Sequence, residues 1–135
     1  MFYDFPLSIP ANTPESSPEE LEAKLTYGVI THVEVEFPPN TGGLAHGRIF
    51  HEAHQVWPTN PDSWFRSNGR AIVWNERYEL FEAPYTLVIQ GYNDDDTFSH
   101  ELIFRFEVLP PEAVTPPSET VPLLTRIARF LGVGK

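Results

Sequence analysis

The stretch from Pro84 to Pro110, PYTLVIQGYNDDDTFSHELIFRFEVLP, decides the fold class of this chain. Between Phe98 and Val108, apolar residues and one histidine occupy every second position, and polar residues hold most of the others. This period of two is typical of a β-strand with one buried face. Residues 85–92 are rich in β-branched and aromatic residues, and residues 93–97 are turn formers. We therefore predict an antiparallel hairpin within an all-β domain.

Further strand patterns precede this hairpin. Residues 27–37 alternate clearly, and weaker patterns cover residues 44–51, 55–57, 70–74 and 78–81, the last either a separate strand or a continuation past a bulge. Strands at a spacing of about 8–12 residues, without helices between them, indicate an antiparallel sandwich or a small barrel. We predict a single antiparallel β-sandwich, Ig-like or jelly-roll-like, over residues 26–109. Its expected core consists of Val33, Val35, Phe37, Ile72, Leu87, Ile89, Leu102, Phe104 and Phe106.

Residues 1–25 are expected to lie outside this domain. The prolines of residues 1–17 favour an extended N-terminal arm, either a solvated leader or an arm that lies on a neighbouring surface. Ser17, Pro18 and Glu20 resemble a capped helix start, so a short helix is predicted to run to Lys24.

The C-terminal residues are also expected to lie outside the domain. Four prolines in residues 110–119 predict a stiff linker. Residues 120–135 then predict a short amphipathic helix, with Thr120 as N-cap and an apolar stripe that includes Leu124, Ile127 and Leu131. A helix of this length is marginal alone in water, so the stripe needs a surface, on its own sandwich or on another protein.

Charge and composition exclude several function classes. Nine basic against nineteen acidic residues give a formal net charge of −10, which opposes binding to nucleic acids and to anionic lipids. There is no cysteine, and no apolar run approaches the roughly 20 residues of a membrane span. Because Met1 is followed by Phe2 and Tyr3 rather than by basic residues, we expect a protein that does not follow the standard secretory route.

Two groups of polar residues are candidates for a metal site. His46, His51 and His54 lack a standard metal-ligand spacing, and residues 93–96 lack the spacing of a calcium loop. We expect a solvated turn at residues 94–96, and neither a metal nor a cofactor. No nucleophile, phosphate-binding or dinucleotide motif is present, so we expect a protein that is not an enzyme.

Aromatic residues are the other candidates for a site. Trp57 and Trp64 flank a loop of prolines and asparagines, and we expect both at the surface, available for a glycan or a protein contact, with Tyr92 as a further platform for a glycan. Trp74 is expected in the core.

The blocks LTYGVITHVEVEFPPNTGG, HQVWPTNPDSWF and YELFEAPYTLVIQGYNDDDTFSHELIFRF resemble a family of small uncharacterised proteins of tailed phages and environmental viral sequences. The resemblance covers residues 25–108. It implies a virion-associated structural role and assigns no activity to any residue.

The layout and the resemblance together predict a non-enzymatic structural or interaction protein. We expect a capsid decoration or tail accessory component of a virion, in several copies, which binds a larger protein assembly or itself; a non-viral protein of this kind is expected in the cytoplasm. The residues expected to bind the partner are Phe2, Tyr3, Phe5, Leu124, Ile127, Leu131, Arg126 and Arg129. Two alternatives are a carbohydrate-binding β-sandwich and an adaptor or cargo protein docked by its C-terminal helix.

Overall fold

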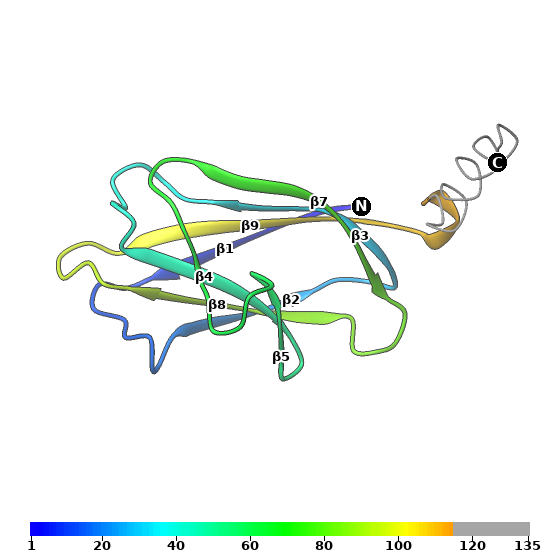
Figure 1. Cartoon of the computed structure of the whole chain (residues 1–135), viewed down its shortest axis with the longest axis horizontal. Coiled ribbons are helices and arrows are strands. Elements are labelled where there is room, and N and C mark those ends of the chain that lie inside the picture. The colour runs from blue at the N-terminus through cyan, green and yellow to red at the C-terminus, as the bar shows by residue number, and fades with distance from the viewer. Residues whose placement is uncertain (115–135) are drawn as a thin grey trace, which may run out of the picture.

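The computed structural model describes residues 1–114 and folds them into nine β-strands and one short 3₁₀ helix (Figure 1). The strands are β1 (Phe2–Ile9), β2 (Glu19–Lys24), β3 (Gly28–Glu36), β4 (Ala45–His51), β5 (His54–Trp57), β6 (Phe65–Arg66), β7 (Ala71–Leu80), β8 (Thr86–Asn93) and β9 (His100–Leu109), and the 3₁₀ helix is η1 (Pro111–Ala113). Strand β7 joins the two patterns predicted at residues 70–74 and 78–81. The helix predicted over residues 120–135 lies outside the described residues.

The strands form two antiparallel sheets, which confirms the all-β prediction. The first sheet has the order β1-β9-β3-β7, and the second has the order β2-β8-β4-β5, with β6 also paired to β4. The pairing is nested along the chain: β1 pairs with β9, β2 with β8, β3 with β7 and β4 with β5. The two layers are visible in Figure 1, where the chain crosses repeatedly from one to the other.

The hairpin predicted within residues 84–110 is wrong. Strand β8 lies in the second sheet, between β2 and β4, whereas β9 lies in the first, between β1 and β3. Each strand buries one face as the alternation predicts, but the two buried faces belong to opposite layers of the core. Phe98 was placed on the buried face of the later strand and is 65% exposed, because β9 begins only at His100.

The N-terminal arm and the short helix are also corrected by the structure. Strand β1 runs beside β9 from the pair Phe2 and Glu107 to the pair Ile9 and His100, and Ile9 is buried. Residues 19–24 form strand β2, which pairs with β8. Both segments are edge strands, since each finds a backbone partner on one side, and the two sheets therefore begin at Phe2 rather than at residue 26.

The core lies between the two sheets and contains the predicted apolar residues. All of them are buried except Ile72, which is half-buried and packs against the others. Two glycines let the sheets approach closely. A Cβ atom added at Gly47 would lie 2.8 Å from Cζ of Phe104, and one at Gly91 would lie 3.1 Å from Cδ2 of Leu7, so both positions exclude a side chain.

Candidate functional site

The two tryptophans that were predicted together at the surface have different environments. Trp57 is only 4% exposed, and its indole Nε1 donates a hydrogen bond to Oε1 of Glu76 at 2.9 Å. Trp74 donates to the same oxygen at 2.9 Å and packs against the core, where it was expected. The surface prediction is therefore wrong for Trp57, because the satisfied indole and the ring contacts with Trp74 and Tyr78 hold it inside. Trp64 is half-buried.

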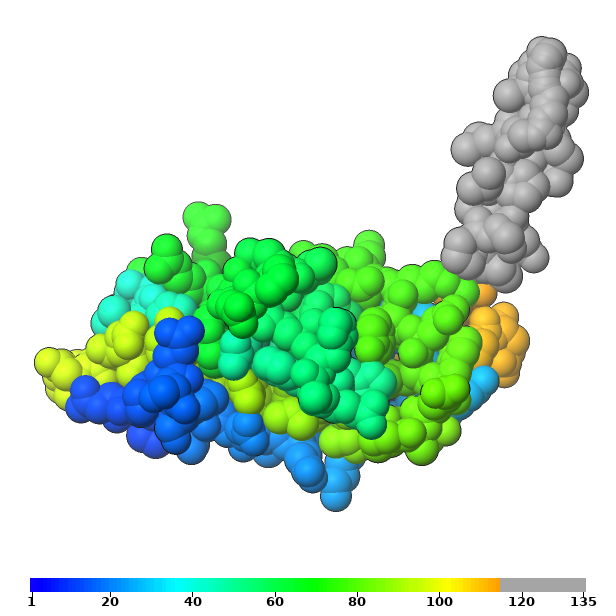
Figure 2. Space-filling model, turned by 60° about the horizontal axis from the view of Figure 1, so that its bottom comes forward, coloured from blue at the N-terminus to red at the C-terminus, as the bar shows by residue number. Residues whose placement is uncertain are grey.

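Trp64 lines a groove on the outer side of the second sheet, which we call the Trp64 groove. Strands β4 and β8 form one side, and the segment 58–66 forms the other, with a volume of ≈ 410 Å³. Figure 2 looks onto this side of the molecule, where the 58–66 segment (green) lies beside β4 (teal). The side chains in the groove are a mixture of aromatic, cationic and neutral polar groups: His46, Pro58, Asn60, Ser63, Trp64, Phe65, Arg66 and Tyr92.

The aromatic rings of the Trp64 groove are fixed by their neighbours. The imidazole of His46 stacks on Tyr92 at 4.1 Å between centroids, and Trp64 stands nearly perpendicular to Tyr92 at 4.7 Å. The guanidinium carbon of Arg48 lies 3.9 Å from the centroid of Trp64, a cation–π distance. Nε1 of Trp64 donates a hydrogen bond to Oε2 of Glu15 at 2.9 Å. These contacts hold Trp64 in one orientation, so its remaining surface is preorganised.

The polar groups of the groove offer both donors and acceptors. Nδ1 of His46 lies 2.9 Å from the carbonyl oxygen of Leu44 and therefore carries the proton, which leaves Nε2 as an acceptor. Burial lowers the pKa of His46, so the ring stays neutral near pH 7. Within residues 1–114, the guanidinium of Arg66 makes no hydrogen bond or ion pair, and the hydroxyl of Tyr92 makes no hydrogen bond. Both are free to meet a ligand.

A second feature is an exposed aromatic cluster at one end of the sheets, which we call the aromatic end. The ring of Tyr27 lies 5.3 Å from that of Phe81 and 6.1 Å from that of Tyr85. Tyr27 is 49% exposed and Phe81 is 38% exposed. Tyr27 and Phe81 lie side by side because their chain neighbours, Gly28 and Leu80, are paired in the first sheet. Gly28 also lies against Leu109, where the chain leaves the sheets. Exposed aromatic side chains that gather at one place, rather than singly, are the kind of surface that a partner can cover.

The N-terminal residues predicted to bind a partner are divided by the strand they form. Phe2 points outward and is exposed, whereas Tyr3 and Phe5 stack on each other at 6.1 Å and pack against the core. The structure therefore leaves only Phe2 of these three available to a partner. Leu124, Arg126, Ile127, Arg129 and Leu131 lie outside the described residues.

The acidic turn at residues 93–99 is not wholly solvated. Asp94 and Asp96 are exposed as predicted, but Asp95 is buried and accepts hydrogen bonds from the backbone N–H groups of Thr97 and Phe98 and from Nε2 of His100. The buried amide of Asn93 donates to the carbonyl oxygen of Phe98 at 3.0 Å. The sequence alone does not distinguish Asp95 from Asp94 and Asp96, because a run of three identical residues does not show which side chain turns inward.

The histidines do not converge. His51 lies 2.8 Å from the hydroxyl of Tyr78, His54 is exposed, and His46 belongs to the groove. Among residues 1–114, no group of three or more histidine, aspartate or glutamate side chains is placed to hold a metal ion.

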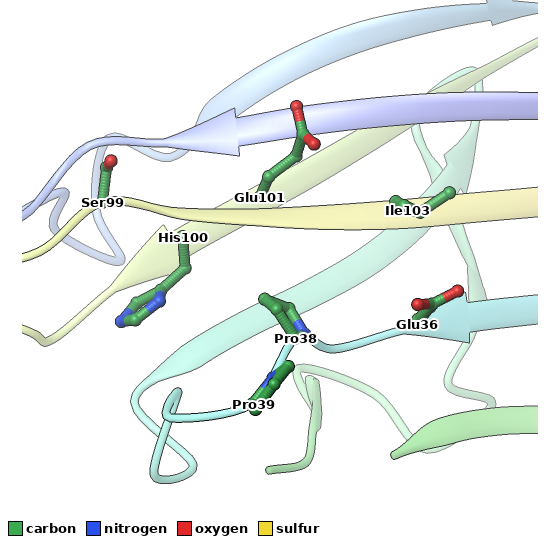
Figure 3. Close-up of a pocket in the computed structure, with 7 residues that line it drawn as sticks. All are labelled: Glu36, Pro38, Pro39, Ser99, His100, Glu101 and Ile103. Carbon is green, nitrogen blue, oxygen red and sulfur yellow. The ribbon is translucent and has the colours of Figure 1, made fainter. Parts of the chain in front are cut away.

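A further pocket of ≈ 340 Å³ lies at the opposite end from the aromatic cluster. Figure 3 shows its lining from the end of β3, the turn with Pro38 and Pro39, and the start of β9. Two of its polar groups are already engaged within the protein, since Glu36 accepts a hydrogen bond from Arg105 at 2.7 Å and His100 is bonded to Asp95, and no aromatic ring other than that of His100 lines it. The Trp64 groove is therefore the better candidate for a ligand site.

In the part of the chain that the structure describes, no helix is long and apolar enough to cross a membrane. The chain matches no protein-family model and no curated protein.

Proposed function

We propose that this protein is a non-enzymatic jelly-roll protein that attaches, in several copies, to a larger protein assembly, as a capsid decoration or tail accessory component of a virion. The observation that carries this proposal is the aromatic end, where Tyr27 and Phe81 present apolar surface beside the exit of the chain from the sheets.

The nested strand pairing supports the jelly-roll assignment over an Ig-like one. In a jelly roll, eight strands form two four-stranded sheets by folding one long antiparallel ribbon over itself, as in viral capsid and lectin domains. Here β1 with β9, β2 with β8, β3 with β7 and β4 with β5 have this arrangement. A fold of this type serves many functions, so the argument for assembly rests on the exposed surface and on the viral resemblance of residues 25–108.

The few exposed aromatic side chains of the aromatic end suit a contact whose affinity is low for one copy and high for many copies together. Burial of apolar surface contributes about 25 cal/mol per Å², and ordering costs remove much of this gain in a single small contact. A lattice that engages several copies at once raises the overall affinity without any new contact. A protein partner needs no enclosed pocket here, because a complementary apolar patch is sufficient for a protein contact.

The test is incorporation into particles. Particles from the source of the protein are separated on a density gradient, and mass spectrometry against an isotope-labelled standard counts the copies of the chain in each fraction. We expect the chain to sediment with the particles. A chain that stays in the soluble fractions and is monomeric in the ultracentrifuge would contradict the proposal.

The contributing surface is tested by variants. Tyr27→Ser combined with Phe81→Ser should reduce rebinding of the purified protein to stripped particles, while the melting temperature stays close to that of the parent. Phe98→Ser is the matched control, because Phe98 is an exposed aromatic residue in the turn between β8 and β9, away from the aromatic end. Deletion of residues 115–135 tests the adaptor alternative, in which the C-terminal segment alone carries the binding.

A further inference from the structure

We propose that the Trp64 groove binds a neutral pyranose ring of a glycan. This inference is independent of the assembly role, because the groove and the aromatic end use different residues.

The first argument is the combination of aromatic and polar surface. A sugar ring has an apolar face of C–H groups that packs on an aromatic ring, and a rim of hydroxyl groups that need both donors and acceptors. Trp64 and Tyr92 supply aromatic surface in the groove. Ligand sites in proteins commonly have this composition, with mostly apolar walls and a few placed polar groups.

The second argument is that three groups in the groove, the guanidinium of Arg66, the hydroxyl of Tyr92 and Nε2 of His46, have no hydrogen-bond partner within residues 1–114. The guanidinium of Arg66 can donate to hydroxyl oxygens, and the hydroxyl of Tyr92 can donate or accept. Nε2 of His46 is an acceptor, because Nδ1 is held by the carbonyl oxygen of Leu44. Together these three groups match the mixed hydrogen-bonding needs of sugar hydroxyls.

The third argument is that the walls are rigid before a ligand arrives. Trp64 is clamped by Arg48 at 3.9 Å, by the edge contact with Tyr92 and by the hydrogen bond to Glu15. Arg48 is itself held by Gln90, whose Oε1 accepts a hydrogen bond from Nε at 2.9 Å. Preorganised side chains lower the ordering cost of binding, which matters for a small polar ligand with little apolar surface to bury.

Charge favours a neutral sugar over an acidic one or a nucleic acid. The chain carries a formal net charge of −10, and Glu15 and Asp94 lie close enough to influence the titration of Tyr92 in the groove. An anionic ligand would meet this field, which the two cations at the groove, Arg66 and Arg48, offset only in part. Uronate-containing oligosaccharides should therefore bind more weakly than neutral ones.

The experiment uses the full chain on an array of immobilised neutral and uronate-containing oligosaccharides, where multivalent display raises weak affinities. Neutral oligosaccharides that bind are then titrated in solution by isothermal titration calorimetry, whose signal does not depend on Trp64. We expect Trp64→Ala to weaken binding by at least about tenfold, which corresponds to ~1.4 kcal/mol. Arg66→Gln should weaken binding severalfold. It should leave the melting temperature unchanged, since the guanidinium of Arg66 makes no hydrogen bond or ion pair within residues 1–114.

Phe98→Ala is the matched control and should bind as the parent does, because it removes an exposed aromatic side chain outside the groove. The proposal is overturned if no neutral oligosaccharide binds the full chain. It is also overturned if binding survives both Trp64→Ala and Arg66→Gln, or if uronate-containing or peptide ligands bind the groove in preference to neutral sugars. Particle incorporation is measured separately, so failure here leaves the assembly role untouched.

Discussion

The carboxylate of Asp95 accepts a hydrogen bond from Nε2 of His100 at 2.9 Å, and both side chains are buried where the chain passes from β8 to β9. The same carboxylate accepts the backbone N–H groups of Thr97 at 2.9 Å and of Phe98 at 3.1 Å. These bonds close the turn that carries the chain from the second sheet to the first. Asp95 is thus a structural residue, although it lies in a run of three aspartates.

The hydrogen bonds at Asp95 predict a pH dependence of stability. The backbone N–H of Thr97, then His100 and the N–H of Phe98, hold the pKa of Asp95 below its usual value. A carboxyl with a lowered folded pKa stabilises the fold above its unfolded pKa of about 3.9, and this contribution is lost as the pH falls through the folded pKa. Asp95→Asn should therefore lower the free energy of unfolding at pH 7, and the difference from the parent should shrink below about pH 4.

The measurement is urea unfolding of both proteins between pH 7 and pH 2. Asp94→Asn is the control, since Asp94 is exposed and should change the free energy of unfolding little at any pH. A difference between Asp95→Asn and the parent that stays constant over the whole range would contradict the assigned role of the charge.

A second prediction concerns the close approach of the sheets at Gly91. A Cβ atom added there would clash with Cδ1 of Ile9, so Gly91→Ala should cost about 1–3 kcal/mol by overpacking. Ile9→Val removes that carbon, and the double variant should recover part of the loss, with a coupling above about 0.5 kcal/mol. The cycle is measured by chemical denaturation. The control is Ile30→Val. Ile30 lies in the same sheet as Ile9 but near the other end of that sheet, so the effects of Ile30→Val and Gly91→Ala on the free energy of unfolding should add.

A third prediction separates the two ends of the chain. Deletion of residues 1–9 should strongly destabilise the fold, because it removes the strand beside β9 and the burial of Leu7 and Ile9, each worth roughly 1.5–3 kcal/mol. Deletion of residues 115–135 should leave the melting temperature unchanged, since residues 1–114 form two sheets and the core between them. Thermal unfolding followed by circular dichroism compares the two proteins. If the protein without residues 1–9 melts at the same temperature as the parent, β1 adds nothing to stability.

A fourth prediction concerns metal ions. Addition of EDTA, and of Ca²⁺ at millimolar concentration, should leave the melting temperature unchanged, because Asp95 is already bonded within the protein and only Asp94 and Asp96 face solvent. A ligand that binds only the folded state would raise the melting temperature by mass action, so an upward shift with Ca²⁺ would reveal a cation site.

The sequence predicted which residues are strands better than it predicted their partners. The alternation in residues 98–108 reports that one face is buried, and the core positions follow from it. It carries no information on whether β8 pairs with β9 or crosses to the other sheet, because that choice depends on contacts with β2 and β4, distant in the chain. The turn residues 93–97 suit a tight hairpin equally well, and only the buried Asn93 and Asp95 distinguish the crossing.

The prediction of a short helix at residues 17–24 was wrong for a different reason. Residues 17–24 contain good helix formers behind a capping pattern, and local propensity favours a helix. In the structure Leu21 and Ala23 face inward while Glu20, Glu22 and Lys24 face outward, so pairing with β8 overrides the propensity. Trp57 and Trp64 show the same limit at the candidate site. The two flank one loop with similar neighbours. Contacts of Trp57 with strand β7, the hydrogen bond to Glu76 and the rings of Trp74 and Tyr78, place it inside.

The nested pairing also constrains how the chain reaches its native state. Strand β9 lies between β1 and β3, and β8 lies between β2 and β4, yet within residues 1–114 β8 and β9 are the last strands to be synthesised. Neither sheet has a continuous ladder of hydrogen bonds until β8 and β9 insert. During translation, the backbone edges of β1 to β4 that pair with β8 and β9 therefore have no partner. Contacts this distant in sequence slow folding and leave intermediates open to aggregation. Expression at low temperature or with chaperones should therefore raise the soluble yield more than any change at the surface.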